Sequence, residues 1–159
     1  MTGKPSRTIP VQATALLFEG HGLLLRGASG SGKSLLALHL IDNADSQRSQ
    51  TALISDDLVD VGLDGDLLML SAPRINKGLI ELRFFGPVRR KQVNQAELHL
   101  VVDFVDELTR LPMAEDFSTR ILDRPVPRLA LMGHPKLDLA HQALLVRAAL
   151  SNHSLNPEG

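Results

Sequence analysis

Short apolar runs separated by polar turns recur along most of the chain, and this spacing is typical of β-strands. Residues 19–22 and 63–67 carry the turn-forming residues of two hairpins. The inserted second hairpin predicts a mixed sheet instead of a purely parallel one. The runs that predict strands cover residues 11–18, 22–26, 51–55, 58–63, 67–70, 79–87 and 98–104.

Two stretches follow a helical pattern instead. Residues 34–43 are rich in good helix formers and end before a polar segment. Residues 139–150 carry an apolar stripe at i, i+4, i+7 and i+11, which predicts an amphipathic helix capped by Asp138. We expect a frayed tail from about Asn152. Residues 109–128 combine four arginines with three prolines, and we expect a loop there from which an arginine could reach a phosphate.

Residues 27–34 match the phosphate-binding loop pattern G-x-x-x-x-G-K-[ST] at every fixed position. The motif lies between a predicted strand and a predicted helix, which is the context it needs. Backbone N–H groups of such a loop wrap a phosphate, and the positive end of the following helix faces the same anion. Lys33 would reach the outer phosphates, and the Ser34 hydroxyl would complete the coordination of Mg²⁺. The predicted nucleotide-binding residues are Gly27, Ala28, Ser29, Gly30, Ser31, Gly32, Lys33 and Ser34.

Two adjacent acids, Asp56 and Asp57, follow the predicted strand 51–55. The strand, helix, strand order implies a right-handed crossover, which brings these acids near the phosphate loop. Because neighbouring strand residues point to opposite sides, one acid could accept a proton while the other holds Mg²⁺ or its waters. A solvated turn is the alternative. Asp103 ends the strand 98–104 in the manner of a Walker B acid and competes for the metal role. We prefer the earlier pair, because the charged residues after Asp103 suggest an ordinary turn.

Composition narrows the class of protein. With 159 residues, 43% apolar and 22% charged, the chain fits one globular α/β domain. The absence of cysteine excludes disulfides, thiolate zinc sites and cysteine nucleophiles. A net charge of -1 and 3% aromatic residues argue against nucleic acid as a partner. No run is long enough to span a bilayer and no signal-type segment is present, so we expect a soluble cytoplasmic protein without a membrane partner.

The order of these features resembles the catalytic domain of the HPr kinase/phosphorylases, which phosphorylate a serine of the phosphocarrier protein HPr and remove the phosphate again. The resemblance implies a single domain over residues 1–159, in which a P-loop-containing mixed sheet is flanked by helices, as in the phosphoenolpyruvate carboxykinases. It rests, in chain order, on His21-Gly22, residues 27–34, Asp56-Asp57, and residues 77–83, which stand where the family has a signature ending in Glu-Ile-Arg-Gly.

The resemblance also implies ligands, partners and roles. ATP, Mg²⁺ and inorganic phosphate are the expected ligands, HPr is the expected protein substrate, and family members form hexamers. Asp56 would be the acid/base, and Arg110 resembles a catalytic arginine of the family. Ser34 and Asp57 would hold the metal with Glu81 close to it. The residues implied to line the phosphates are His21, Lys33 and Arg83.

The chain departs from the family in three places. It lacks the N-terminal domain of the larger members and so resembles the truncated forms. Phe84 replaces the glycine after the signature arginine, and residues 133–138 replace a Pro-Gly-Arg-Asn segment that captures the protein substrate. These departures from the family bear most on how the protein substrate docks and on whether the chain has the phosphorylase activity. Two other functions stay open: a kinase for a small metabolite with a closed acceptor pocket, and a nucleotide-sensing module that would tolerate the loss of Asp56.

Overall fold

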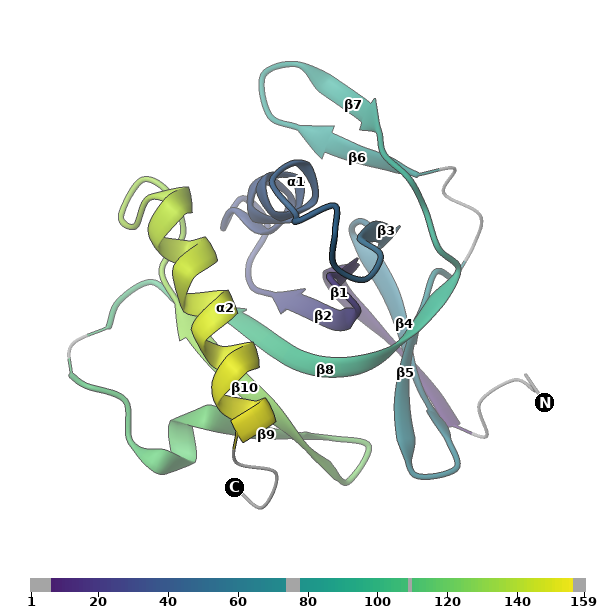
Figure 1. Ribbon diagram of the computed structural model, residues 1–159, viewed down its shortest axis with the longest axis vertical. Coiled ribbons are helices and arrows are strands. Elements are labelled where there is room, and N and C mark those ends of the chain that lie inside the picture. The colour runs from purple at the N-terminus through teal and green to yellow at the C-terminus, as the bar shows by residue number, and fades with distance from the viewer. Residues whose placement is uncertain (1–6, 74–77, 109, 156–159) are drawn as a thin grey trace.

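The computed structural model describes residues 7–73, 78–108 and 110–155, with the backbone alone for 153–155. A strongly curved sheet is covered by two helices, and a small separate hairpin stands at one end of the molecule (Figure 1). The elements are β1 (Arg7–Phe18), β2 (His21–Arg26), α1 (Lys33–Asp42), β3 (Ala52–Ser55), β4 (Leu58–Asp64), β5 (Leu67–Ser71), β6 (Leu79–Leu82), β7 (Gly86–Arg89), β8 (Gln95–Phe104), the 3-10 helix η1 (Ala114–Phe117), β9 (Ser118–Ile121), β10 (Arg124–Leu131) and α2 (Leu139–Leu155).

The main sheet is mixed, as the inserted hairpin predicted. It has eight strands in the order β2-β1-β4-β5-β8-β10-β9, with β3 paired to β1. β8 runs parallel to β2 and β10, whereas its first part pairs antiparallel with β5. The additional β2–β8 pairing closes β2, β1, β4, β5 and β8 into a circuit. The sequence predicted the mixed pairing but not this closure.

The long strand β1 is what brings the two chemically important strand ends together. It pairs antiparallel with β2 and also antiparallel with β3. β2 and β3 therefore run in the same direction, and their carboxyl ends reach the same edge of the sheet. The phosphate-loop motif follows β2 there, and Asp56 follows β3.

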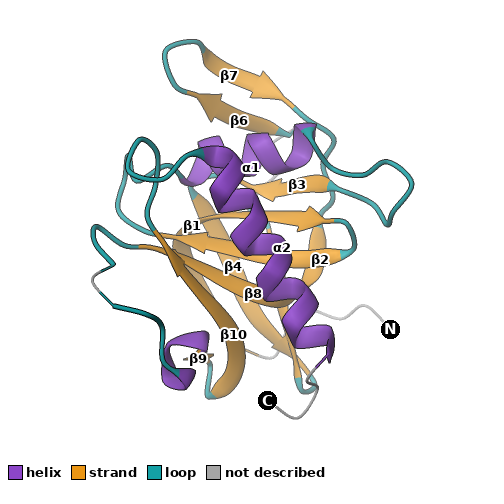
Figure 2. Cartoon of the chain, turned by 60° about the vertical axis from the view of Figure 1, so that its left-hand side comes forward, coloured by secondary structure: helices purple, strands orange, loops and turns teal. Residues whose placement is uncertain are grey.

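Two apolar cores lie on the two faces of the curved sheet. One packs the sheet against both helices and includes Leu36 and Leu40 of α1 and Val146 of α2. Figure 2 shows α1 and α2 on this same face. The other core fills the space on the opposite face between β1, β4, β5 and β8. The predicted stripe of α2 lies on the first core, and Asp138 caps the helix by accepting a hydrogen bond from the His141 N–H at 2.8 Å.

The prediction of one strand over residues 79–87 is wrong. The segment forms the β6–β7 hairpin instead, with Leu79 paired to Arg89 and Leu82 to Gly86. The Phe85 N–H closes the turn onto the Leu82 carbonyl at 3.0 Å, and Phe84 takes φ of 70°. A phenylalanine is not a turn signal, so the sequence pattern continued as one strand to residue 87.

The predicted loop over residues 109–128 is also partly wrong, because this stretch contains η1, β9 and the start of β10. Leu122 and Asp123 turn β9 into β10 with φ of 49° and 63°. The prolines at 125 and 127 fall where β10 pairs with β9, and its pairing with β8 begins only at Arg128. A proline can occupy a strand whose second edge has no partner, since no ladder hydrogen bond is lost there.

At the C-terminus, α2 continues to Leu155, beyond the position at which the sequence suggested a frayed tail. A bidentate ion pair fixes the helix to the β1–β2 turn: Arg147 donates to the two Glu19 carboxylate oxygens at 2.8 and 2.9 Å. This hydrogen bonding by Arg147 lowers the pKa of Glu19. Within the described ranges, we find no helix with the length and apolar character that crossing a membrane requires.

Candidate functional site

The phosphate-loop motif occupies the connection between β2 and α1 and is open to solvent. Gly27 and Gly32 have φ of 155° and 108°, values that side chains disfavour. A Cβ on Gly27 would lie 2.8 Å from both Phe104 Cβ and Ser31 Oγ, so only glycine fits this turn. Residues 28–30 are exposed. The loop is closely packed at Gly27 and exposed at residues 28–30, which suits a loop that binds a ligand from the solvent.

Two side chains of the loop are suited to an anion. Lys33 Nζ donates to the carbonyl oxygens of Gly27 and Ala28 at 2.8 and 2.9 Å, which holds the ammonium over the loop. Ser31 Oγ is buried and has no hydrogen-bond partner among the described residues. An unpaired buried hydroxyl is costly unless a ligand or water satisfies it. These groups fit the predicted phosphate ligand.

Asp56 connects the loop to the surrounding elements. Its Oδ1 accepts hydrogen bonds from the hydroxyls of Ser34 and Thr14, each at 2.8 Å. Its Oδ2 accepts a hydrogen bond from the Glu81 backbone N–H at 3.1 Å. One carboxylate therefore joins α1, β1 and β6 at the mouth of the phosphate loop. The strand order predicted this proximity, and the catalytic role of Asp56 stays a prediction.

The residues predicted to hold the metal surround this carboxylate. Ser34 and Glu81 contact Asp56 directly, the latter through its backbone. Asp57 follows at φ of 78° and is exposed, so the two neighbouring acids occupy different environments. Hydroxyl and carboxylate oxygens are the ligands that Mg²⁺ prefers, and it usually keeps several waters. In residues 7–73, 78–108 and 110–155, no cluster of three or more His, Cys, Asp or Glu could hold a metal by itself.

Asp103, the competing acid, is engaged in an ion network. Arg26 donates to its two carboxylate oxygens at 2.7 and 2.9 Å, and Arg128 donates at 2.6 Å. Burial raises the pKa of Asp103, but the hydrogen bonds from the two arginines outweigh it and hold the pKa below its usual value. Asp103 therefore stabilises the fold through its two arginine partners. This favours Asp56 and Asp57 as the acid/base and the metal ligand.

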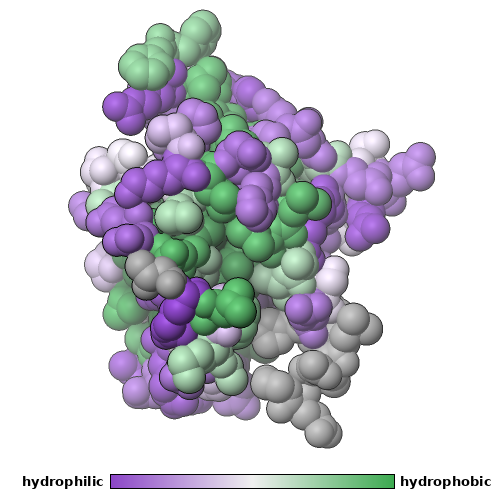
Figure 3. Space-filling view, turned by 90° about the vertical axis from the view of Figure 1, so that its left-hand side faces the viewer, coloured by the Kyte–Doolittle hydropathy of each residue, from purple (hydrophilic) through white to green (hydrophobic). Residues whose placement is uncertain are grey.

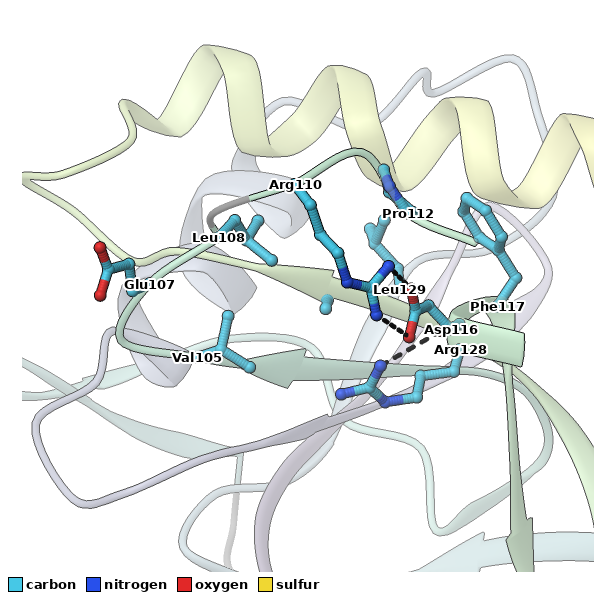
Figure 4. Close-up of a pocket in the computed structure, with 10 residues that line it drawn as sticks. Val105, Glu107, Leu108, Arg110, Pro112, Asp116, Phe117, Arg128 and Leu129 are labelled. Carbon is cyan, nitrogen blue, oxygen red and sulfur yellow. Dashed lines mark hydrogen bonds and ion pairs between the residues drawn. The ribbon is translucent and has the colours of Figure 1, made fainter. Parts of the chain in front are cut away.

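Arg110 lies in a neighbouring cavity of about 240 Å³ (Figure 4). Its guanidinium donates to the Asp116 carboxylate at 2.8 Å and to the Leu111 carbonyl at 3.2 Å. Arg128 lines the same cavity and donates to the Asp116 carbonyl at 3.1 Å. The residues that line the cavity include none of the phosphate loop. Among the described residues, Arg110 therefore bonds to its own segment and not to the loop, and its catalytic role stays a prediction.

Two other predicted residues, His21 and Arg83, contact aromatic rings. His21 begins β2, and the six residues from there to Gly27 span about 20 Å at the rise of a strand. Its ring meets His99 edge to face at a centroid distance of 5.3 Å. This placement does not favour the phosphate contact implied for His21, which stays a prediction. Arg83 lies at the β6–β7 turn, where its guanidinium stacks 5.3 Å from the Phe84 ring centroid.

Thr14 is a site residue that sequence reasoning missed. It is fully buried in β1 and donates a hydrogen bond to Asp56. A hydroxyl in the middle of an apolar strand was the available signal, since buried polar groups need partners.

Comparison with known proteins gives relatives named HPr kinase/phosphorylase. No family model matches the sequence. The HPr kinase/phosphorylase of Peptoclostridium acidaminophilum is 32% identical over 162 residues, covering 94% of this chain and 49% of the relative. The HPr kinase/phosphorylase of Geobacillus thermodenitrificans is 29% identical over 172 residues, covering 100% of this chain and 52% of the relative. The chain thus spans about half the length of these relatives. Among solved structures, the Hpr(Ser) kinase/phosphatase of Coxiella burnetii matches with a TM-score of 0.75 and 28% identity, covering 95% of this chain and 93% of the other.

Proposed function

Since the chain is a homologue of the HPr kinase/phosphorylases over about half of their length, we propose that it transfers the γ-phosphoryl group of ATP to a serine of HPr. The observation that carries this proposal is the 2.8 Å hydrogen bond between Ser34 of the phosphate loop and Asp56. It supports the proposal because a carboxylate beside the phosphate loop could accept the proton of an acceptor hydroxyl that attacks the terminal phosphate of a nucleotide bound there.

The phosphate loop would bind the nucleotide. Loop N–H groups and the start of α1 favour an anion, and Lys33 would exchange its two carbonyl partners for phosphate oxygens. Ser34, Asp57 and Glu81 would hold Mg²⁺, which neutralises phosphate charge when it is bound. The binding energy of these groups would position the terminal phosphate in line with the acceptor.

Asp56 would act as the general base. Its hydrogen bonds to Thr14, Ser34 and Glu81 fix the carboxylate before the substrate arrives. In the forward direction it takes the proton of the serine hydroxyl as the oxygen attacks phosphorus. In the proposed reverse direction it takes a proton from inorganic phosphate and then protonates the serine that leaves, which yields pyrophosphate and free HPr.

The openness of the site favours a protein acceptor. Residues 28–30 at the rim of the loop are exposed, and Asp56, which bonds to Ser34 of the loop, is only partly buried. A small-metabolite kinase would need an enclosed acceptor pocket with its own polar groups. A nucleotide-sensing module would need no positioned base, yet three donors hold Asp56 in place.

The test is a transfer assay with the purified chain, Mg²⁺, γ-labelled ATP and HPr, followed by addition of inorganic phosphate. We expect label on one serine of HPr and its release as pyrophosphate after phosphate is added. HPr with that serine replaced by alanine is the matched control and should stay unlabelled. ATP binding without transfer would favour the sensing module. Sedimentation of the same sample would test the hexamer that the family resemblance implies.

A further inference from the structure

The end of the β6–β7 hairpin exposes two adjacent aromatic rings. Phe84 is 97% exposed and Phe85 is 76% exposed, and Phe84 is the most exposed large apolar side chain in the described ranges. The hairpin projects from the body of the molecule, and apolar side chains are exposed at its end (Figure 3). Exposed apolar groups gathered at one place often mark an interaction site.

The same hairpin is anchored at the proposed catalytic carboxylate. Ile80 is buried in the core beneath α1, and the Glu81 N–H bonds to Asp56. Phe84 follows Glu81 by three residues, so their Cα atoms lie at most about 11 Å apart. The two rings therefore stand at the edge of the site where the acceptor must approach.

The backbone gives no internal reason for a phenylalanine at position 84. Its φ of 70° lies in the left-handed region, which is unfavourable for a bulky residue and free of strain for glycine. The ring contacts the Arg83 guanidinium at 5.3 Å and otherwise faces solvent. A strained, exposed aromatic residue beside a site indicates a contact outside the chain.

We propose that Phe84 and Phe85 dock the protein substrate, an inference that rests on the proposed kinase function. The substrate would carry an apolar patch beside its acceptor serine, with an acidic group able to face Arg83. A protein interface of standard size covers about 800 Å² on each partner, equivalent to a disc of roughly 16 Å radius. An interface centred on Asp56 would therefore include the hairpin end, whereas a small metabolite would not touch it.

Calorimetric titration of HPr into the full chain tests this assignment. The variant combines Phe84→Gly with Phe85→Ala, because glycine suits the backbone at position 84. The matched control is Leu144→Ala, which removes a 67% exposed leucine from α2. We expect the hairpin variant to bind HPr at least about tenfold more weakly, as for the loss of aromatic hot spots. ATP affinity and the melting temperature should not fall, and the control should stay within about twofold of the unchanged chain.

Several results would overturn the docking role. These are unchanged HPr affinity in the hairpin variant, an equal loss in Leu144→Ala, no binding of HPr to the unchanged chain, or a change in subunit number caused by the hairpin substitutions. The transfer assay separates this proposal from the kinase function. HPr binding through the hairpin without transfer would refute only the kinase, and full transfer with undiminished affinity in the variant would refute only the docking role.

Discussion

Ser34 Oγ and Asp56 Oδ1 lie 2.8 Å apart, although 22 positions separate the two residues in the chain. The contact exists because β1 pairs with both β2 and β3, which directs the phosphate loop and the acidic pair to one edge of the sheet. The contact joins Ser34, which would complete the coordination of Mg²⁺, to Asp56, which would accept the proton of the acceptor hydroxyl. The predictions below test the residues around this contact.

Replacement of Lys33 by alanine should weaken ATP binding directly. Charge-assisted hydrogen bonds are worth about 1.5–3 kcal/mol, which corresponds to a loss of affinity of roughly 10- to 100-fold. Titration calorimetry with ATP measures this loss. Lys91→Ala is the matched control, because Lys91 is exposed and lies outside the site. Equal ATP affinities in the two variants would count against the phosphate loop.

Asp57→Asn should raise the Mg²⁺ concentration needed for transfer while leaving the maximal rate at saturating Mg²⁺ within about tenfold. Asparagine tolerates the left-handed backbone of this position, so the fold is preserved. The removal of one charged oxygen ligand weakens a cation site without removing the base. Rates measured across a Mg²⁺ series decide the point, and an unchanged Mg²⁺ requirement would exclude Asp57 from the metal site.

Asp103→Asn should destabilise the fold by about 3 kcal/mol, because it leaves Arg26 and Arg128 without their shared anion. The pKa of Asp103 is lowered in the folded state. Asp103 therefore stabilises the fold fully at a pH above the pKa of about 4 that it has in the unfolded chain. This stabilisation is lost as the pH falls through the lower pKa that Asp103 has in the folded state. Urea unfolding should show a constant difference between the two proteins from about pH 7 to 5 and a smaller one below about pH 4. A difference that grows in acid would refute the ion network.

His21→Asn should leave the transfer rate within about threefold, because β2 holds His21 at the end of the strand remote from the loop. The ring of His21 instead meets His99 edge to face, and His99 Nδ1 accepts a hydrogen bond from the Gly22 N–H at 3.0 Å. Steady-state rates with HPr and ATP provide the measurement. A loss of two or more orders of magnitude, with the melting temperature unchanged, would restore His21 to the catalytic residues.

Much of the fold was predictable, because the signals that define it are local. The pattern of apolar runs located β1 to β5 and β8, and the turn residues at 19–22 and 63–67 located two hairpins of the main sheet. The glycine-rich loop lies between a strand and a helix, as its motif predicted, and its role as a nucleotide site stays a prediction. These features depend on backbone conformation and side-chain period, which neighbouring residues determine.

The failures have a different physical origin. The turn at Phe84 uses a residue that turns disfavour, so local propensity gave no warning. β10 contains two prolines and is still a strand, because only its later part has neighbours on both sides. Tertiary pairing, which one sequence does not display, decided whether these segments form strands.

The most direct test of the account is the initial rate of phosphoryl transfer to the HPr serine by the unchanged chain and by Asp56→Asn, with ATP saturating. Removal of a positioned acid/base typically costs about two to four orders of magnitude. We predict a loss of that size in the variant, with ATP affinity retained because the phosphate loop is intact. Transfer by Asp56→Asn at the rate of the unchanged chain would contradict the central claim.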